Sequence, residues 1–209
     1  MNIGNLVFDL DGTLYPYSKE IENNVNSKSI DLFCRYLSKS QSEVWQILQE
    51  IRAKGFYGTE ISEDYGISKS EFIEYVCDVD VSMLQPNQNL ADKLSQITIP
   101  KFVFTDSTTK HVCDVLSQLQ IPCDFFVDII DGHHTNYRYK YSKDGFEKFF
   151  ERTQTIPQEC VIFEDSYRNI EVAKQLGMQT VLIRSDKNDY PAADFQFANI
   201  DDALDRFIK

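Results

Sequence analysis

The feature that most constrains the fold of this chain is a series of short apolar runs, each of strand length. They are rich in β-branched and aromatic residues and lie at 6–8, 102–104, 125–130, 161–163 and 180–183. Uninterrupted apolar runs of this length are typical of strands that are buried on both faces. Helical periodicities lie between the later runs. Strands and helices that alternate at short intervals predict an α/β fold with a parallel sheet.

The segment between the first two runs has a different pattern. From about residue 17 to 84 no run is typical of a strand, and the apolar residues recur at helical spacings. Two S-x-x-E sequences, at 40–43 and 68–71, are capping boxes that mark helix starts. We therefore predict an all-helical domain, 17–85, that is inserted after the first strand of a core domain made of 1–16 and 86–209.

The balance of charge limits the classes of partner. Among 209 residues, 33 Asp and Glu face 21 Lys and Arg, which gives a net charge of −12. A chain this acidic is repelled by a phosphate backbone, so we expect no nucleic-acid polymer as a partner. The negative electrostatic potential of such a chain also repels small anions, unless a cation or a basic group lies at the site that binds them.

Neither a membrane nor a disulfide framework is expected. No stretch approaches the roughly 18 apolar residues that a spanning helix needs. The 5 cysteines are odd in number and widely spaced, whereas a disulfide framework or a cysteine metal site needs closer pairing. We interpret them as reduced packing residues of a cytoplasmic protein. The oligomeric state is left open.

Acidic and hydroxyl residues follow three of the predicted strands. These residues are Asp9, Asp11 and Thr13 after the first, Thr105, Asp106 and Ser107 after the second, and Glu164, Asp165 and Ser166 after the fourth. The carboxyl ends of parallel strands meet at one edge of the sheet, where ligands bind. Because carboxylates repel one another, so many of them are tolerated at one edge only if a cation binds among them. Hard oxygen ligands with incomplete protein coordination predict Mg²⁺ that keeps waters and takes a phosphate oxygen from the substrate.

The chemistry of these residue types predicts phosphoryl transfer. At the end of its strand, Asp9 is placed to attack phosphorus and form an aspartyl-phosphate. Asp11, two residues on, is placed to protonate the leaving alcohol and later to deprotonate water. Gly12 permits a tight turn that exposes N–H groups to an anion. Thr105 or Ser107 is expected to bind a phosphoryl oxygen, and a lysine from the middle of the chain to neutralise the charge.

Four segments resemble, in order, the four motifs of the haloacid dehalogenase superfamily of phosphohydrolases. They are Phe8–Tyr15 (FDLDGTLY), Phe104–Ser107 (FTDS), Lys140 within Tyr139–Ser142 (YKYS), and Phe163–Ser166 (FEDS) with Asn169–Ile170. The resemblance runs to about Ile183. It implies a Rossmann-like core with a helical cap inserted after the first strand.

Site residues follow from the same resemblance. It implies Asp9 as nucleophile, Asp11 as general acid and base, Thr105 as phosphate binder and Lys140 as the neutralising cation. Mg²⁺ would be held by Asp9, the Asp11 carbonyl and Asp165, with Glu164 in support. The substrate-binding residues expected around them are Gly12, Thr13, Asp106 and Ser107.

The sequence departs from the family pattern at two of these motifs. Asp106 stands where the family usually has Asn, which adds a negative charge near the phosphate site. Tyr141 follows Lys140, where the family usually has Pro. Lys143, three residues on, is a second candidate for the lysine of the third motif. The spacing along the sequence from Lys140 to Phe146 matches the K-P-x-x-x-x-F pattern of that motif, which favours Lys140.

A narrower resemblance points to the pyrimidine 5′-nucleotidase branch of the superfamily. It is carried by Leu14–Pro16, Phe56–Thr59 and Ala173–Val181. It implies action on nucleoside 5′-monophosphates or similar small phosphates, with Phe56 and Tyr57 as the best substrate-binding candidates in the cap.

Several alternatives stay open. A sugar-phosphate phosphatase, a phosphomutase or a dehalogenase could be built on the same scaffold, although a dehalogenase would need neither Mg²⁺ nor Asp11. A phosphoacceptor signalling domain is disfavoured by the long helical insertion. A non-catalytic phosphate-binding or interaction protein is kept open by Asp106.

Overall fold

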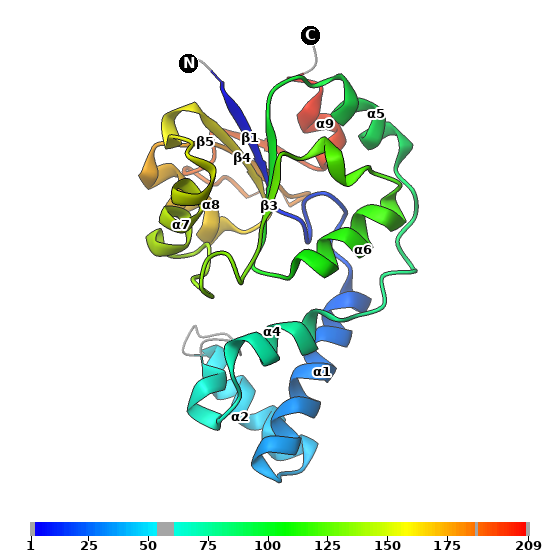
Figure 1. Ribbon diagram of the computed structural model, residues 1–209, viewed down its shortest axis with the longest axis vertical. Helices are drawn as coiled ribbons and strands as arrows, with labels where there is room; N and C mark the ends of the chain where they lie inside the picture. The colour runs from blue at the N-terminus through cyan, green and yellow to red at the C-terminus, as the bar shows by residue number, and fades with distance from the viewer. Residues whose placement is uncertain (1–2, 54–60, 187, 208–209) are drawn as a thin grey trace. The chain divides into compact units, whose positions relative to one another are not determined.

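The computed structural model describes residues 3–53, 61–186 and 188–207 (Figure 1). The chain divides into two compact units. Met1–Tyr17 and Ser82–Lys209 form the core unit, and Ser18–Val81 form the helical unit. For comparison, the insertion predicted from the sequence ran from 17 to 85.

The described residues of the core unit build a six-stranded parallel sheet in the order β3-β2-β1-β4-β5-β6. The strands are β1 Asn5–Phe8, β2 Lys101–Phe104, β3 Asp128–Ile130, β4 Cys160–Glu164, β5 Gln179–Ile183 and β6 Phe195–Phe197. This confirms the predicted α/β fold with its parallel sheet. Phe8, the last residue of β1, is paired with Val103 of β2 and Phe163 of β4. The chain that follows β1 therefore leaves the sheet at the centre of its carboxyl edge.

Helices cover both faces of the sheet, as Figure 1 shows, with α7 and α8 on one side and α5, α6 and α9 on the other. Their bounds are α5 Gln88–Gln96, α6 Thr109–Leu119, α7 Lys143–Thr153, α8 Tyr167–Leu176 and α9 Ile200–Leu204, with short 3-10 turns η2 at Cys123–Phe125 and η3 at Pro157–Glu159. The helices α6 and α8 each begin shortly after a strand ends, so their N-termini lie at the carboxyl edge of the sheet.

Aromatic rings pack on both faces of the sheet near its carboxyl ends. On the α7 face, the ring of Phe104 lies 5.3 Å from that of Phe146 and 4.9 Å from that of Phe149. On the other face, Phe8 stacks on Phe163 at 4.7 Å. Successive strand residues point to opposite faces, so a run that is apolar throughout fills both layers.

Two sequence-based predictions about the region around α6 and β3 are wrong. The run 125–130 does not form one strand, because the turn η2 ends at Phe125 and β3 begins only at Asp128. The N–H of Phe126 donates to the Cys123 carbonyl and closes this turn, which leaves Val127 68% exposed. Cys113 and Cys123 are exposed and are not packing residues.

The described residues of the helical unit contain helices and no strand. They form α1 Lys19–Leu37, α2 Gln41–Ala53, η1 Ser62–Tyr65 and α4 Lys69–Cys77. Both capping boxes begin helices: Ser40 and Glu43 bond each other's N–H, and Ser68 accepts from the N–H of Glu71. The unit has its own apolar core, in which the ring of Phe33 lies 5.7 Å from that of Phe72. In the described part of the chain, no helix is long and apolar enough to cross a membrane.

Candidate active site

A buried ion pair lies at the end of β1. Asp9 directly follows the strand, and its N–H donates to the Phe163 carbonyl at 2.9 Å. Its side chain is almost fully buried, as is that of Lys140. The Lys140 Nζ donates to Asp9 Oδ1, to Glu164 Oε2 at 2.8 Å and to the Phe104 carbonyl at 3.1 Å. An ammonium has three N–H donors, so this environment uses all of them.

One oxygen of Asp9 is left for a ligand. Asp9 Oδ2 is buried and has no hydrogen-bond partner among the described residues. Burial raises the pKa of Asp9 well above its usual value, and the neighbouring Glu164 adds to this, while Lys140 opposes it. Burial alone would lower the pKa of Lys140, but Asp9 and Glu164 outweigh it and raise that pKa. The lysine is therefore charged, and it forms ion pairs with both Asp9 and Glu164.

Three carboxylates form a cluster that suits a cation. Oxygens of Asp9, Glu164 and Asp165 all lie within 4.8 Å of one another. Glu164 already accepts bonds through both oxygens, from Lys140 on one and from the N–H groups of Asp165 and Ser166 on the other, at 3.1 and 3.0 Å. Burial and the charge of Glu164 raise the pKa of Asp165 to about 7. An all-oxygen donor set with an unpartnered buried oxygen fits a hard divalent cation.

Gly12 brings the backbone after Asp11 against this cluster. Its φ is +86°, a left-handed conformation that glycine adopts without strain. A Cβ at this position would lie 2.5 Å from Asp165 Oδ2 and 2.9 Å from its Cγ. A side chain would therefore separate the turn from Asp165.

Two rings hold the carboxylate of Asp11. The hydroxyl of Tyr15 donates to Asp11 Oδ1, and His111 Nε2 lies 2.9 Å from the same oxygen. Burial would raise the pKa of Asp11, but the hydrogen bonds with His111 and Tyr15 outweigh it and lower that pKa. The Asp11 side chain is 43% exposed, so it still reaches solvent or a ligand.

Small polar side chains surround the acids. Thr105 follows β2, and its Oγ1 accepts from the N–H of Ser107 at 3.1 Å. The hydroxyls of Thr13 and Ser107 are buried without a hydrogen-bond partner among the described residues. Buried polar atoms nearly always have partners, so these two hydroxyls are available to bond a polar ligand.

Asp106 adds a further negative charge to this edge of the sheet. Its Oδ1 accepts from the backbone N–H of Lys140 at 3.2 Å. Burial raises the pKa of Asp106 to about 6, with Lys140 acting in the opposite direction. The contact ties the chain after β2 to the loop that carries the lysine.

The structure brings most of the predicted site residues to one edge of the sheet. They are Asp9, Asp11, Gly12, Thr13, Thr105, Asp106, Ser107, Lys140, Glu164 and Asp165. Of the two candidate lysines, Lys140 is the buried one, whereas Lys143 is exposed at the start of α7. Phe56 and Tyr57 lie outside the described residues.

Two residues of this edge were missed by sequence reasoning. His111 was not singled out, because its apolar neighbours in α6 make the segment resemble an ordinary core helix. The available signal was its place in the first turn of a helix that begins at the carboxyl edge. Arg184, which follows β5, was also missed; its Nη1 donates to the Asp165 carbonyl at 3.2 Å.

Comparisons with known proteins agree with this architecture. A model of the family described as haloacid dehalogenase-like hydrolase matches residues 6–183. No curated protein matches the chain.

Three solved structures illustrate the likeness in fold. A phosphatase of the same superfamily from Thermococcus onnurineus has 18% identity and a TM-score of 0.67, covering 99% of this chain and 97% of that one. A mutant of CbbY from Rhodobacter sphaeroides, in complex with xylulose-1,5-bisphosphate, has 16% identity and a TM-score of 0.65, covering 95% of each chain. L-2-haloacid dehalogenase from Xanthobacter autotrophicus, with chloropropionic acid covalently bound, has 14% identity and a TM-score of 0.60, covering 97% of each.

Proposed function

Because this chain belongs to the haloacid dehalogenase-like hydrolase family, we propose that it is a Mg²⁺-dependent phosphomonoester hydrolase acting through an aspartyl-phosphate on Asp9. The observation that carries the proposal is the pair of carboxylates after β1. Asp9 is buried against Lys140, one of its oxygens has no partner among the described residues, and Asp11 is held two residues away. A nucleophile and a separate acid–base group are what a two-step transfer needs.

The acidic cluster is the proposed metal site. Asp9, Asp165 and the Asp11 carbonyl would hold Mg²⁺, and Glu164 would support them by fixing Lys140 and the turn at Asp165. When bound, the ion would neutralise the carboxylates that otherwise repel a phosphate and would polarise a phosphoryl oxygen.

The first chemical step is the phosphorylation of Asp9. A carboxylate oxygen of Asp9 attacks phosphorus, and a new P–O bond forms. The bond between phosphorus and the ester oxygen breaks, and its electron pair goes to the alcohol oxygen. That oxygen takes a proton from Asp11, which reacts in its protonated form, the minor form at neutral pH because its pKa is lowered. Lys140 stabilises the negative charge on the transferred group.

The second step regenerates the enzyme. Asp11, now a carboxylate, takes a proton from water, and the water oxygen attacks phosphorus. The bond between phosphorus and the Asp9 oxygen breaks, and its electron pair returns to the carboxylate. Inorganic phosphate leaves, and both aspartates regain their starting states.

The unpartnered hydroxyls provide the phosphate pocket in this proposal. Ser107 and Thr13 have buried Oγ atoms without partners among the described residues, and Thr105 lies in the short connection between β2 and α6. The tight turn at Gly12, with φ at +86°, would present backbone N–H groups to the anion in this proposal.

We further propose nucleoside 5′-monophosphates or similar small phosphates as the substrates. Support comes from the resemblance of Leu14–Pro16 and Ala173–Val181 to the pyrimidine 5′-nucleotidase branch. The second candidate is a sugar phosphate, which the likeness to CbbY in complex with xylulose-1,5-bisphosphate favours.

A test of the proposed activity is hydrolysis of p-nitrophenyl phosphate with Mg²⁺, with EDTA and with Asp9→Asn. We expect turnover with Mg²⁺ and its loss in the other two conditions. Asp128→Asn is the matched control, because Asp128 lies in β3 and pairs with Arg152 at 2.7 Å, away from the cluster. Activity that survives EDTA or Asp9→Asn would overturn the mechanism.

Three further measurements separate the alternatives. Release of chloride from 2-chloropropionate without Mg²⁺ would identify a dehalogenase instead. A panel of nucleoside and sugar monophosphates tests the narrower proposal; a clear preference for sugar phosphates over UMP and CMP would defeat the nucleotidase assignment. Binding of phosphate without any turnover would identify a non-catalytic protein.

A further inference from the structure

His111 contacts the acid–base aspartate from a different element of the core unit. Thr108 caps the N-terminus of α6 by accepting from the His111 N–H at 3.2 Å, so His111 lies in the first helical turn. Its side chain is buried, and Nε2 lies 2.9 Å from Asp11 Oδ1. The other ring nitrogen, Nδ1, is buried without a partner among the described residues. The contact with Asp11 is thus the hydrogen bond that orients this ring.

The same Asp11 oxygen is held from a second side. The Tyr15 hydroxyl donates to Oδ1, and the turn that joins the two residues is closed by N–H bonds from Thr13 and Leu14 to the Leu10 carbonyl, at 3.2 and 3.0 Å. Tyr15 is 3% exposed, whereas the Asp11 side chain is 43% exposed. Two buried rings therefore clamp one oxygen of a carboxylate whose remaining surface faces outward.

We propose that His111 is a positioning residue that holds the Asp11 carboxyl group in the orientation needed to protonate the leaving alcohol. This inference rests on the proposed function and deepens it. His111 acts through Asp11 and needs no contact with the substrate.

The physical reason is rotational freedom. A carboxylate on a half-exposed turn rotates about two side-chain bonds unless its oxygens are held. Proton transfer requires the donor within about 2.6–3.2 Å of its acceptor. A displacement of about 1 Å can cost 10²-fold in rate. Tyr15 belongs to the same turn as Asp11, whereas His111 belongs to α6, so the contact with His111 ties Asp11 to a separate element of the core unit.

A positioning role for the acid has a specific kinetic signature. A leaving group that is a weak base departs without help from an acid, whereas a more basic one needs the proton in the transition state. The loss caused by removing His111 should therefore grow with the basicity of the leaving group. The measured quantity is kcat/KM, which covers the steps up to departure of the alcohol and excludes hydrolysis of the phosphoenzyme.

The experiment compares p-nitrophenyl phosphate with phenyl phosphate, two esters of similar shape, for the full chain with Mg²⁺. For His111→Ala we expect kcat/KM to fall at most about threefold on the first and about tenfold or more on the second. The ratio of the two values does not depend on the fraction of folded enzyme, so a destabilised variant still gives an interpretable result.

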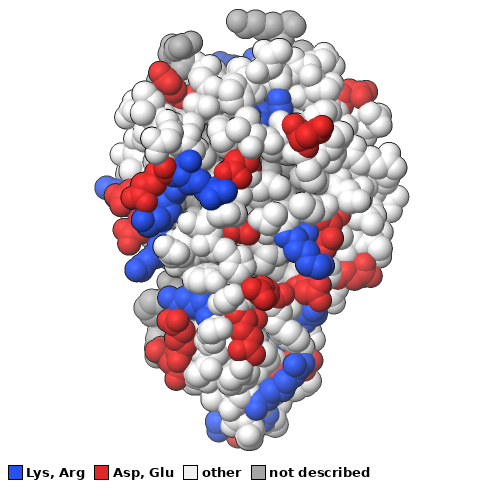
Figure 2. All heavy atoms as spheres, viewed as in Figure 1, with Lys and Arg blue, Asp and Glu red and all other residues white. Residues whose placement is uncertain are grey.

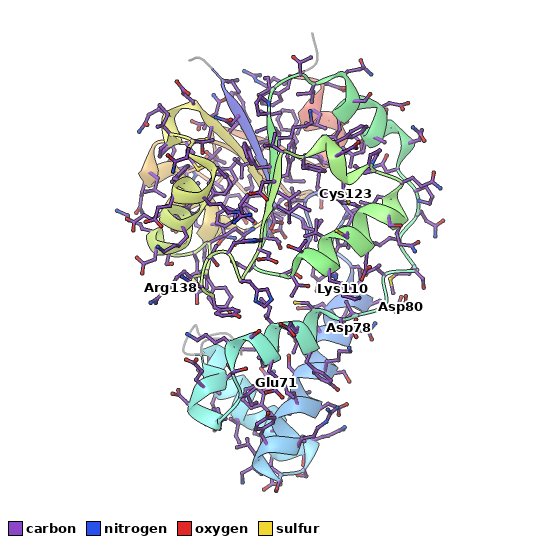
Figure 3. The ribbon with its side chains drawn as sticks, in the orientation of Figure 1. Glu71, Asp78, Asp80, Lys110, Cys123 and Arg138 are labelled. Carbon is purple, nitrogen blue, oxygen red and sulfur yellow. The ribbon has the colours of Figure 1, made fainter. Side chains whose placement is uncertain are left out.

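Two conservative variants sharpen the test. The amide of His111→Gln reaches about as far as Nε2 and should restore much of the ratio, whereas the shorter amide of His111→Asn should not. The matched control is Lys110→Ala, whose position at the start of α6 is labelled in Figure 3. Lys110 is 67% exposed and pairs with Asp114 at 2.8 Å, so its removal should leave the ratio unchanged.

The possible outcomes distinguish the positioning role of His111 from the phosphatase activity itself. Equal losses of His111→Ala on both esters, or no loss, overturn the positioning role while the phosphatase activity stands. A wild-type enzyme that hydrolyses neither ester overturns the proposed function, and this inference with it. A ratio that falls in His111→Ala and returns in His111→Gln supports it.

Discussion

The ammonium of Lys140 lies between the buried carboxylates of Asp9 and Glu164, and its positive charge is what allows both of them to be buried. Both contacts, to Asp9 and to Glu164, lie within the carboxyl edge of the sheet, where the three side chains are almost fully withdrawn from water. Carboxylates in such a place are tolerated only while a counter-charge is present.

We expect Lys140→Met to be destabilised, because it leaves Asp9 and Glu164 buried without their partner. Breaking a buried pair on one side costs about 3–5 kcal/mol. Urea denaturation without Mg²⁺ measures the change in the free energy of unfolding. Lys148→Met is the control, because Lys148 forms an exposed pair with Glu151 and should cost no more than about 1 kcal/mol. Equal losses in the two variants would contradict the central role of Lys140.

Asp106 should make phosphate binding depend on pH. Its pKa is raised to about 6 by burial, so the group is neutral below that pH and negative above it. The negative form repels a phosphate nearby. Asp106→Asn, which cannot ionise, should therefore bind inorganic phosphate about tenfold tighter than the wild type at pH 8, and about equally at pH 5.

The inhibition constant of phosphate against p-nitrophenyl phosphate provides the measurement. At any one pH both proteins meet the same mixture of phosphate ions, so the ratio of their inhibition constants at that pH reports the effect of Asp106. A ratio that does not change between pH 5 and pH 8 would remove Asp106 from the phosphate pocket.

At the scale of elements, α7 fixes the position of the loop that carries Lys140. Gly145 lies in the first turn of α7 against this loop. A Cβ at Gly145 would contact the Tyr139 carbonyl oxygen and lie 2.8 Å from that of Arg138. The helix and the loop can approach this closely only because the side chain is absent.

Gly145→Ala should consequently displace Lys140 and lower kcat/KM by about tenfold or more, since shifts near 1 Å cost up to 10²-fold. Circular dichroism should show that the helices are retained. Glu147→Ala, an exposed position on the same helix, is the control and should retain full activity. Retained activity in Gly145→Ala would mean that the loop does not need this contact.

The elements that could be predicted from the sequence are those with one dominant signal. The strands β1, β2, β4 and β5 each contain an apolar run of three or four residues, because both of their faces are covered. The start of β3 could not be predicted, because Phe125 and Phe126 are equally apolar but belong to a turn. Its boundary depends on hydrogen bonds that periodicity does not report.

The candidate site divides in the same way. The meeting of Asp9 with Glu164 and Asp165 follows from topology, because parallel strands end at one edge. The roles assigned to them stay predictions. His111 was missed, since a polar residue beside Val112 on an apolar helix face looks the same whether it contacts a site or a core. Its place in the first turn of a helix that follows a strand end is the signal for a site, and the tertiary position of α6 shows the contact itself.

In the molecule as a whole, the net charge of −12 is not distributed evenly. On the face drawn in Figure 2, acidic and basic side chains are interspersed and no broad basic patch is seen among the residues drawn in colour. The buried cluster of carboxylates concentrates part of the negative charge, and a divalent cation there would relieve its repulsion.

Mg²⁺ should therefore stabilise the folded protein. A ligand at 100 times its Kd adds about 2.7 kcal/mol, and each kcal/mol shifts Tm by about 2–4 °C for a chain of this size. We expect a rise of about 5–10 °C in wild type and in Asp128→Asn, with potassium chloride at equal ionic strength as the salt control. In Asp165→Asn the rise should be largely lost. An equal rise in Asp165→Asn would place the ion elsewhere.

The mechanism requires that the phosphoryl group is transferred first to Asp9, as a covalent aspartyl-phosphate, and then to water. Asp11→Asn lacks the base that activates water, so it should hold the phosphoenzyme longest when mixed with p-nitrophenyl phosphate and Mg²⁺. Acid quenching followed by mass spectrometry of the peptides locates the phosphoryl group. We expect it on Asp9 in the wild type and in Asp11→Asn, and nowhere in Asp9→Asn. Phosphate release without a phosphoryl group on Asp9, or with that group on another residue, would overturn the aspartyl-phosphate mechanism.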